Sequence, residues 1–222
     1  MSSPLDSFLD RPVRGFLDEL AARTPIPGGG GAAAVTGALA AGLVAMAARF
    51  SAARLPGAGD LADQADELRR RVTDLTDLDA RAYQSVLELR TREALHGAAV
   101  VPLEIAEIGA RVAAMSEQVA GAGNPNLRGD AVTGALLAAA SARSAACLVD
   151  INVGLGGLDP ELSRRAARAA ADAADAAGRA TMGAERAGQE LLFRPLGVPR
   201  RDVGVGAAAD LDTHACLARG VA

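Results

Sequence analysis

Four consecutive glycines stand directly before an alanine-rich stretch that favours a helix. Residues 24–39 read TPIPGGGGAAAVTGAL, so Gly28, Gly29 and Gly30 follow two prolines. Neither Lys nor Ser/Thr comes after the last glycine, which excludes a phosphate-binding P-loop. What remains is a helix N-terminus, where free N–H groups favour a negative charge or a polarised carbonyl. The run therefore predicts either close approach of the backbone to a ligand or tight helix packing.

A single aspartate interrupts an otherwise apolar heptad pattern. Between residues 61 and 89, the positions spaced alternately four and three apart are all apolar except Asp79. A lone polar residue in such a seam commonly fixes the register of the helices. A buried carboxylate with a raised pKa is, however, also suited to general acid–base catalysis. The pattern leaves both roles open for Asp79.

Other polar residues are fewer and have ordinary structural explanations. Asn126 belongs to a turn rich in Gly, Asn and Pro, and Asp130 complements the dipole at a helix start. Asn152 is harder to explain, because it comes late in a mostly apolar helix. His214 and Cys216 form an H-x-C pair, but a metal site needs three or four ligands. We therefore predict no metal site.

The elements that must position these residues are helices. Helical periodicity is present throughout and the alternation typical of strands is nearly absent, which predicts an all-α bundle with long helices. Residues 1–193 are expected to form one helical domain, and residues 194–222 an irregular tail or an arm onto a partner. We expect helices over about 12–22, 32–53, 60–95, from 102 to the turn at 121–126, 127–153 and 160–193, with 24–31 as a loop.

The composition favours close packing and association. Half of the 222 residues are apolar, tryptophan is absent, and Ala and Gly dominate the apolar half. Such faces bury little area within one chain, so we expect a protein that is not a monomer. The hexapeptide AVTGAL occurs at 34–39 and again at 131–136, which places Gly37 and Gly134 on small faces of two central helices.

Charge and hydropathy limit the possible partners. The net charge is −4, and nothing indicates a nucleic-acid groove. Two cysteines give no disulfide framework, and the N-terminus has no signal-peptide pattern. Residues 32–48 are uncharged and nearly long enough to cross a membrane, but we judge them too weakly hydrophobic and expect no second span. We predict a cytoplasmic protein with no membrane partner.

Four separated stretches together resemble one known family. The first is FLDELAARTPIPGGGGAAAVTGALAAGLVAMAA, and it is followed by DARAYQSV at 79–86 and VPLEIAE at 101–107. The last is GNPNLRGDAVTGALLAAA, followed by VDINVG. Their order and register over about residues 10–155 resemble the formiminotetrahydrofolate cyclodeaminase / methenyltetrahydrofolate cyclohydrolase family.

The resemblance implies a fold, a partner and a reaction. Members of that family are all-helical, form intertwined homodimers, and bind reduced folate in a cleft at the glycine loop. They open or close a C–N bond at a one-carbon centre and need no bound cofactor; reduced folate is the substrate. By this resemblance the catalytic residues are Asp79 and Asp130, and the substrate-binding residues are Gly28, Gly29, Gly30, Tyr83, Asn126 and Asn152.

The sequence also departs from the family pattern. Gly31 and Gly129 stand where the family usually has Ser, and Leu148 where Asn is common. Three hypotheses therefore remain open. The protein is a folate cyclodeaminase or cyclohydrolase, a repurposed relative that closes or opens a C–N ring on another small amine in specialised metabolism, or a non-catalytic subunit that shares a site with a paralogous partner.

Overall fold

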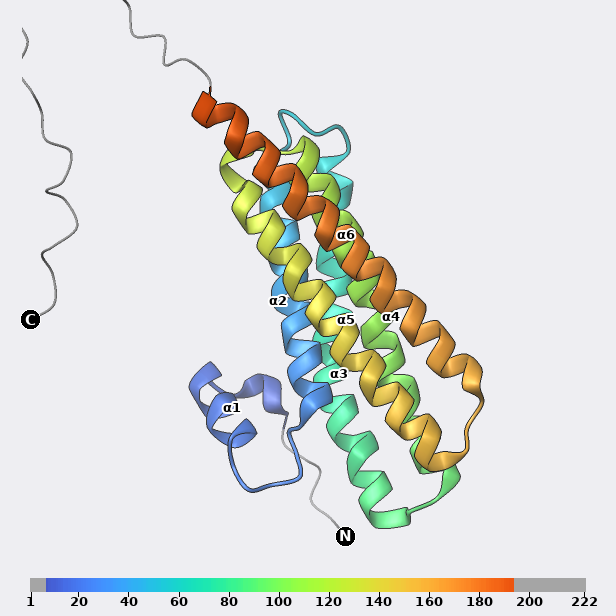
Figure 1. Ribbon diagram of the computed structural model, residues 1–222. Coiled ribbons are helices and arrows are strands. Elements are labelled where there is room, and N and C mark those ends of the chain that lie inside the picture. Colours follow the sequence, from blue (N-terminus) through green and yellow to red (C-terminus); the bar gives the residue numbers. More distant parts are fainter. Residues whose placement is uncertain (1–6, 194–222) are drawn as a thin grey trace, which may run out of the picture.

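Five long helices form an elongated bundle in the computed structural model (Figure 1). The structure describes residues 7–193, with side chains through residue 185; residues 194–222, including His214 and Cys216, lie outside the described residues. The elements are η1 (Phe8–Asp10), α1 (Val13–Leu20), α2 (Gly29–Arg49), α3 (Ala58–Leu89), α4 (Arg92–Ala122), η2 (Pro125–Leu127), α5 (Arg128–Gly156) and α6 (Pro160–Phe193). The described residues contain no strand, and the predicted all-α bundle is confirmed.

Two predicted helix boundaries are wrong. The glycines at 29–31 are the first turn of α2 and not part of a loop, and only Gly28 before them is extended. The chain between α3 and α4 turns at Arg90, which has a φ of 54°, and Thr91 then caps α4 by accepting a hydrogen bond from the N–H of Ala94 at 3.2 Å. The helix expected over 60–95 therefore ends at Leu89, and the one expected to begin at Pro102 begins ten residues earlier, with Pro102 inside it.

The repeated hexapeptide marks the place where α2 and α5 approach each other. A Cβ added to Gly37 of α2 would lie 2.9 Å from the Oγ of Ser141, which itself donates to the carbonyl of Ala33 at 2.7 Å. A Cβ added to Gly134 of α5 would lie 3.4 Å from the carbonyl oxygen of Ala40. Its closest contact would be the Oγ of Ser116 at 3.2 Å, so an added Cβ would be crowded at both glycines, which agrees with the predicted small faces.

The chain N-terminal to α2 lies beside the bundle and not within it. In Figure 1, η1 and α1 pack next to the N-terminal end of α2, away from α4 and α6. Phe8 and Phe16 are buried there against Ala80 of α3, together with the partly buried Leu20, Ile26 and Val35. This small apolar cluster is separate from the main core, which α2, α3, α4, α5 and α6 share.

Two segments satisfy the length and hydropathy of a membrane span. They are Gly29–Arg49, with a mean hydropathy of 1.8, and Pro125–Gly156, with a mean hydropathy of 1.5. The expectation that no second segment would qualify is therefore wrong. Of the two apolar windows, 56% and 39% are buried in the bundle, and the core helix of a soluble protein passes the same test.

Candidate functional site

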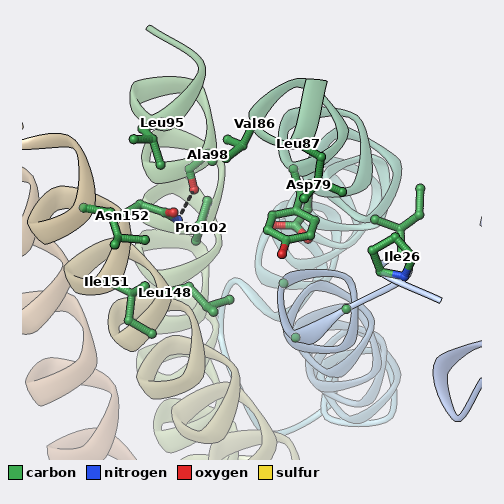
Figure 2. A pocket seen from close by; sticks show the side chains of 16 residues that line it. Ile26, Asp79, Val86, Leu87, Leu95, Ala98, Pro102, Leu148, Ile151 and Asn152 are labelled. Atoms are coloured by element: carbon green, nitrogen blue, oxygen red, sulfur yellow. Dashed lines mark hydrogen bonds between the residues drawn. The ribbon is translucent and has the colours of Figure 1, made fainter. Parts of the chain in front are cut away.

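A cavity of about 450 Å³ opens at the end of the bundle where α2 begins and α3 ends. Figure 2 shows Asp79, Val86 and Leu87 of α3 on one side of it and Leu148, Ile151 and Asn152 of α5 on the other. Its remaining lining residues are Pro25, Ile26, Gly28, Gly29, Gly30, Tyr83, Leu95, Ala98, Pro102 and Leu155. The glycine run and the polar residue of the heptad seam thus meet in one place.

Asp79 is packed against the first turn of α2. A Cβ added to Gly30 would lie 2.0 Å from its Oδ1, so only glycine leaves room for the carboxylate at this position. The backbone N–H of Gly31 donates a hydrogen bond to the same carboxylate. Added Cβ atoms at Gly28 and Gly29 would meet nothing closer than 3.7 Å. The packing requirement therefore falls on Gly30, and the carboxylate at the helix N-terminus is the chain's own.

Burial raises the pKa of Asp79 from 3.8 to about 6, and the hydrogen bond from Gly31 opposes part of that rise. The cause is the loss of water around the charged form, which the single N–H does not replace. At neutral pH the carboxylate is mostly ionised, yet its pKa is close enough to 7 for it to accept and return a proton. That is the property that a general base needs.

Asn152 is held by a hydrogen bond to a backbone carbonyl that has no helical donor because of a proline. Pro102 has no N–H, so the carbonyl of Ala98, four residues earlier in α4, lacks its usual helical donor. The Nδ2 of Asn152 donates to that carbonyl at 2.8 Å (Figure 2). Because the amide nitrogen is used in this way, its Oδ1 is left as an acceptor at the cavity. Pro102 therefore positions Asn152 from the neighbouring helix.

The rest of the lining is apolar. Val86, Leu87, Leu95, Leu148, Ile151 and Leu155 supply most of the wall, and no arginine lines this cavity in the part of the chain that the structure describes. A ligand with a flat apolar ring and a positive charge would match such a wall around one carboxylate. No group of three or more His, Cys, Asp or Glu residues among the described ones could hold a metal ion.

The structure brings six of the eight predicted site residues together and leaves two apart. Those that line the cavity are Gly28, Gly29, Gly30, Asp79, Tyr83 and Asn152. Asn126 is exposed in η2, and Asp130 lies in the first turn of α5. Asp130 and Asn152 are 22 residues apart along this helix, roughly 33 Å at 1.5 Å per residue. Within one chain, Asn126 and Asp130 do not reach the cavity.

Some lining residues carry no functional signal in the sequence. Pro25 and Ile26 belong to the quoted glycine segment, but nothing in their types indicates a wall. Leu148 stands where the family commonly has Asn, yet it is the side chain closest to a Cβ added to Gly29, at 3.9 Å. A proline inside a helical pattern was the one available signal, because it implies a free carbonyl four residues before it.

A family model supports what this geometry indicates. The model described as "Formiminotransferase-cyclodeaminase" matches residues 12–172, which include every residue that lines the cavity. The chain belongs to this family. The matched range ends inside α6, so residues 194–222 lie outside it as well.

Curated relatives and a solved structure agree with this assignment. The cyclodeaminase-family chain is 34% identical over 169 residues to the methenyltetrahydrofolate cyclohydrolase of Methylorubrum extorquens, covering 66% of this chain and 80% of the relative. It is 31% identical over 150 residues to the formimidoyltransferase-cyclodeaminase of Mus musculus, covering 55% of this chain but 27% of that longer protein. The crystal structure of formiminotetrahydrofolate cyclodeaminase from Thermotoga maritima matches with a TM-score of 0.75 and 25% identity, over 82% of this chain and 99% of the other.

Proposed function

We propose that this protein is an enzyme that hydrolyses the cyclic C–N bond of a methenyl-bearing reduced folate, as a methenyltetrahydrofolate cyclohydrolase does. The observation that carries the proposal is Asp79, a half-buried carboxylate with a pKa of about 6 that faces an apolar cavity at the start of α2. The cyclohydrolase relative also matches over 80% of its own length. Deamination of a formimino folate by the same site is the second candidate, since two of the named relatives carry that activity in their names.

The proposed reaction assigns two proton transfers to Asp79. In the first, its carboxylate takes a proton from water while the water oxygen bonds to the methenyl carbon, which removes the positive charge of the amidinium. In the second, Asp79 returns that proton to the ring nitrogen as the C–N bond breaks and the carbon keeps its oxygen as a formyl group. The second proton of the water leaves to solvent, so one water is consumed and one proton is released. A positioned carboxylate of matched pKa suits both steps.

The apolar wall supports a cationic ring as the substrate. None of the described residues that line the cavity is an arginine, so an ionised Asp79 has no cationic partner among them. A substrate cation would supply that partner, and it would be stabilised more strongly in low dielectric than in water. The Oδ1 of Asn152 is placed to accept a hydrogen bond from a ring N–H.

The test separates the two folate reactions. Purified protein is given methenyltetrahydrofolate and the loss of its absorbance is followed; in a second assay formiminotetrahydrofolate is supplied and ammonia is measured. We expect the first reaction to be the faster one. Ammonia release alone would replace the proposal with the deaminase, and inactivity in both assays would favour the repurposed enzyme or the non-catalytic subunit.

We propose further that the active form is a homodimer. An apolar groove of about 640 Å³ lies along α2 between α3 and α5, lined by Leu9, Val35, Leu39, Leu43 and Met46 among others. Leu39 is 59% exposed, and Phe50, at the end of α2, is 65% exposed. Large apolar side chains thus point outward while α2 turns mostly alanines inward. Such a face is typical of a subunit interface.

A second copy packed antiparallel on this face would complete the site. The loop that carries Asn126 is tied to the far end of α2, because Asn124 donates to the carbonyl of Phe50 at 3.2 Å. With two α2 helices antiparallel, that loop of the partner comes to the N-terminal end of α2, where the cavity lies. In this arrangement Asn126 and Asp130 would reach the cavity of the other subunit, whereas within one chain they do not reach a cavity.

Mixing two inactive variants tests the shared site. Asp79→Asn and Asp130→Asn, each inactive alone, should regain about a quarter of the native activity after subunit exchange, because half of the dimers are mixed and each holds one intact site. Sedimentation should show a dimer. Absence of recovery in a proven mixed dimer, or an active monomer, would contradict this proposal. We expect a small-molecule enzyme of the cytoplasm.

A further inference from the structure

Asp77 lies two residues before Asp79 on α3, and its carboxylate faces the N-terminal segment instead of the cavity. The Oδ2 of Asp77 accepts a hydrogen bond from the Oγ of Ser7 at 2.6 Å, and its Oδ1 accepts one from the N–H of Phe8 at 3.0 Å. The guanidinium of Arg81 lies 3.9 Å away. Asp77 is 9% exposed. Both carboxylate oxygens are thus used by residues 69 and 70 positions away in the sequence.

The segment that Asp77 holds continues directly into the cavity wall. Phe8 and Phe16 are buried against Ala80, which lies three residues after Asp77 on the same face of α3. Ile26 packs on this cluster and also lines the cavity next to Pro25. The same chain then enters α2, whose Gly31 N–H donates to Asp79. One end of the segment is fastened by Asp77, and the other end lines the cavity that Asp79 also lines.

We propose that Asp77 is a positioning residue for the candidate active site: its carboxylate fastens residues 7 and 8 to α3 and so holds Pro25 and Ile26 as a wall that keeps water from Asp79. The effect on turnover rests on the proposed function, but the effect on Asp79 does not. The main alternative is that Asp77 only stabilises the fold.

Asp66 provides a matched control on the same helix. It is also an α3 carboxylate with two partners, Arg49 and Arg69, and Arg49 belongs to α2. It does not line the cavity, and neither of its partners does. Removing Asp66 therefore also takes two side-chain partners from an α3 carboxylate, but without touching the wall.

The test measures the titration of the Asp79 carboxyl by carbon NMR, without substrate, in the wild type, Asp77→Ala, Asp77→Asn and Asp66→Ala. Loss of the wall admits water, so in Asp77→Ala we expect the pKa of Asp79 to fall by about one unit from about 6 toward 3.8. Asp77→Asn keeps an acceptor for the N–H of Phe8 and should retain most of the rise. Asp66→Ala should leave the titration unchanged. Among the described residues, Tyr83 is the one other titratable side chain that lines the cavity, and it is present in all four proteins.

Kinetics supply a second measurement. In Asp77→Ala we expect KM to rise about tenfold, with a smaller change in kcat, because a wall that contacts substrate is displaced while Asp79 remains. If Asp77→Ala does not fold, Ser7→Ala removes one of the two hydrogen bonds and should shift the titration in the same direction by less. An unchanged Asp79 titration in every folded variant overturns the proposal. An inactive wild type contradicts the proposed function and leaves the titration to decide on Asp77.

Discussion

The two faces of α3 near its C-terminal end carry aspartates with opposite surroundings. Asp77 accepts hydrogen bonds from Ser7 and Phe8, so the chain itself satisfies its carboxylate. Among the described residues Asp79 receives the N–H of Gly31 alone, and it lines the apolar cavity, where burial raises its pKa to about 6. The difference follows from which element packs on each face. A buried carboxylate with two donors of its own stabilises structure, whereas one with a single donor beside a cavity is left free for chemistry.

The largest effect should come from removing the free carboxylate. Asp79→Asn keeps the shape of the side chain but cannot take a proton, so turnover should fall by about 10²- to 10⁴-fold. Steady-state kinetics and a thermal melt measure the two consequences separately. Asp79→Leu is the companion variant: if Asp79 only fixed helix register, both variants would keep full turnover.

Crowding the free carboxylate should have the next largest effect. In Gly30→Ala the added Cβ would meet the Asp79 carboxylate at 2.0 Å, so the carboxylate must move. We expect kcat/KM to fall by about 10²-fold, the usual cost of a displaced catalytic group. Gly31→Ala is the control, since its Cβ would meet nothing closer than 3.7 Å, it does not line the cavity and its backbone N–H is kept, and it should change kcat/KM by less than about twofold. Equal losses in the two variants would mean that the glycines serve the helix and not Asp79.

The desolvation that suits Asp79 for proton transfer should also lower the stability of the folded protein at neutral pH. The pKa of Asp79 is raised above 3.8 in the folded state, so its protonated carboxyl favours folding. This contribution to the free energy of unfolding is fully present below pH 3.8 and is lost as the pH rises through about 6. Asp79→Asn should therefore be more stable than the wild type above pH 6, by about 1–3 kcal/mol in the free energy of unfolding.

Urea unfolding at a series of pH values checks this result. The two proteins should converge near pH 4, where the wild-type carboxyl is protonated in the folded state. Asp77→Asn should show no such gain, because its carboxylate has partners to lose. If the wild type were instead more stable than Asp79→Asn at pH 7, the ionised Asp79 would have a stabilising partner, which would contradict this prediction.

The smallest effect concerns Asn152, whose amide nitrogen is used by the chain while its oxygen is free. In Pro102→Ala the new N–H can bond to the carbonyl of Ala98 and so displace Asn152. We expect a more stable α4 and a rise in KM of about threefold to tenfold, the worth of one hydrogen bond. Kinetics with the single variant and with Asn152→Ala measure it. If the free-energy effects of Pro102→Ala and Asn152→Ala on KM add fully in the double variant, Pro102 does not act through Asn152.

Much of the fold was accessible from the sequence. The 3.6-residue period predicted the long helices, and the repeated AVTGAL predicted the small faces of Gly37 and Gly134 that let α2 and α5 approach. The break at Arg90 and Thr91 was missed, because the residues on both sides favour a helix and only one capping side chain marks the boundary. The position of the glycines inside α2 was also missed, since glycine in a helix is unfavourable until its neighbours are known.

By itself the sequence determined the helical class, the family and the identity of the aspartate that breaks the heptad seam. Periodicity and motif order can be recognised along the chain without knowing which residues are in contact. Tertiary structure alone decided that Asp77 has two hydrogen-bond donors from the N-terminal segment while Asp79 lines an apolar cavity, since this depends on which distant segment packs on each face of α3. It also decided that Pro102 frees a carbonyl for Asn152, and that Asn126 and Asp130 lie at the far end of α5 from the cavity. These contacts join residues from different helices, and no local pattern fixes how helices meet.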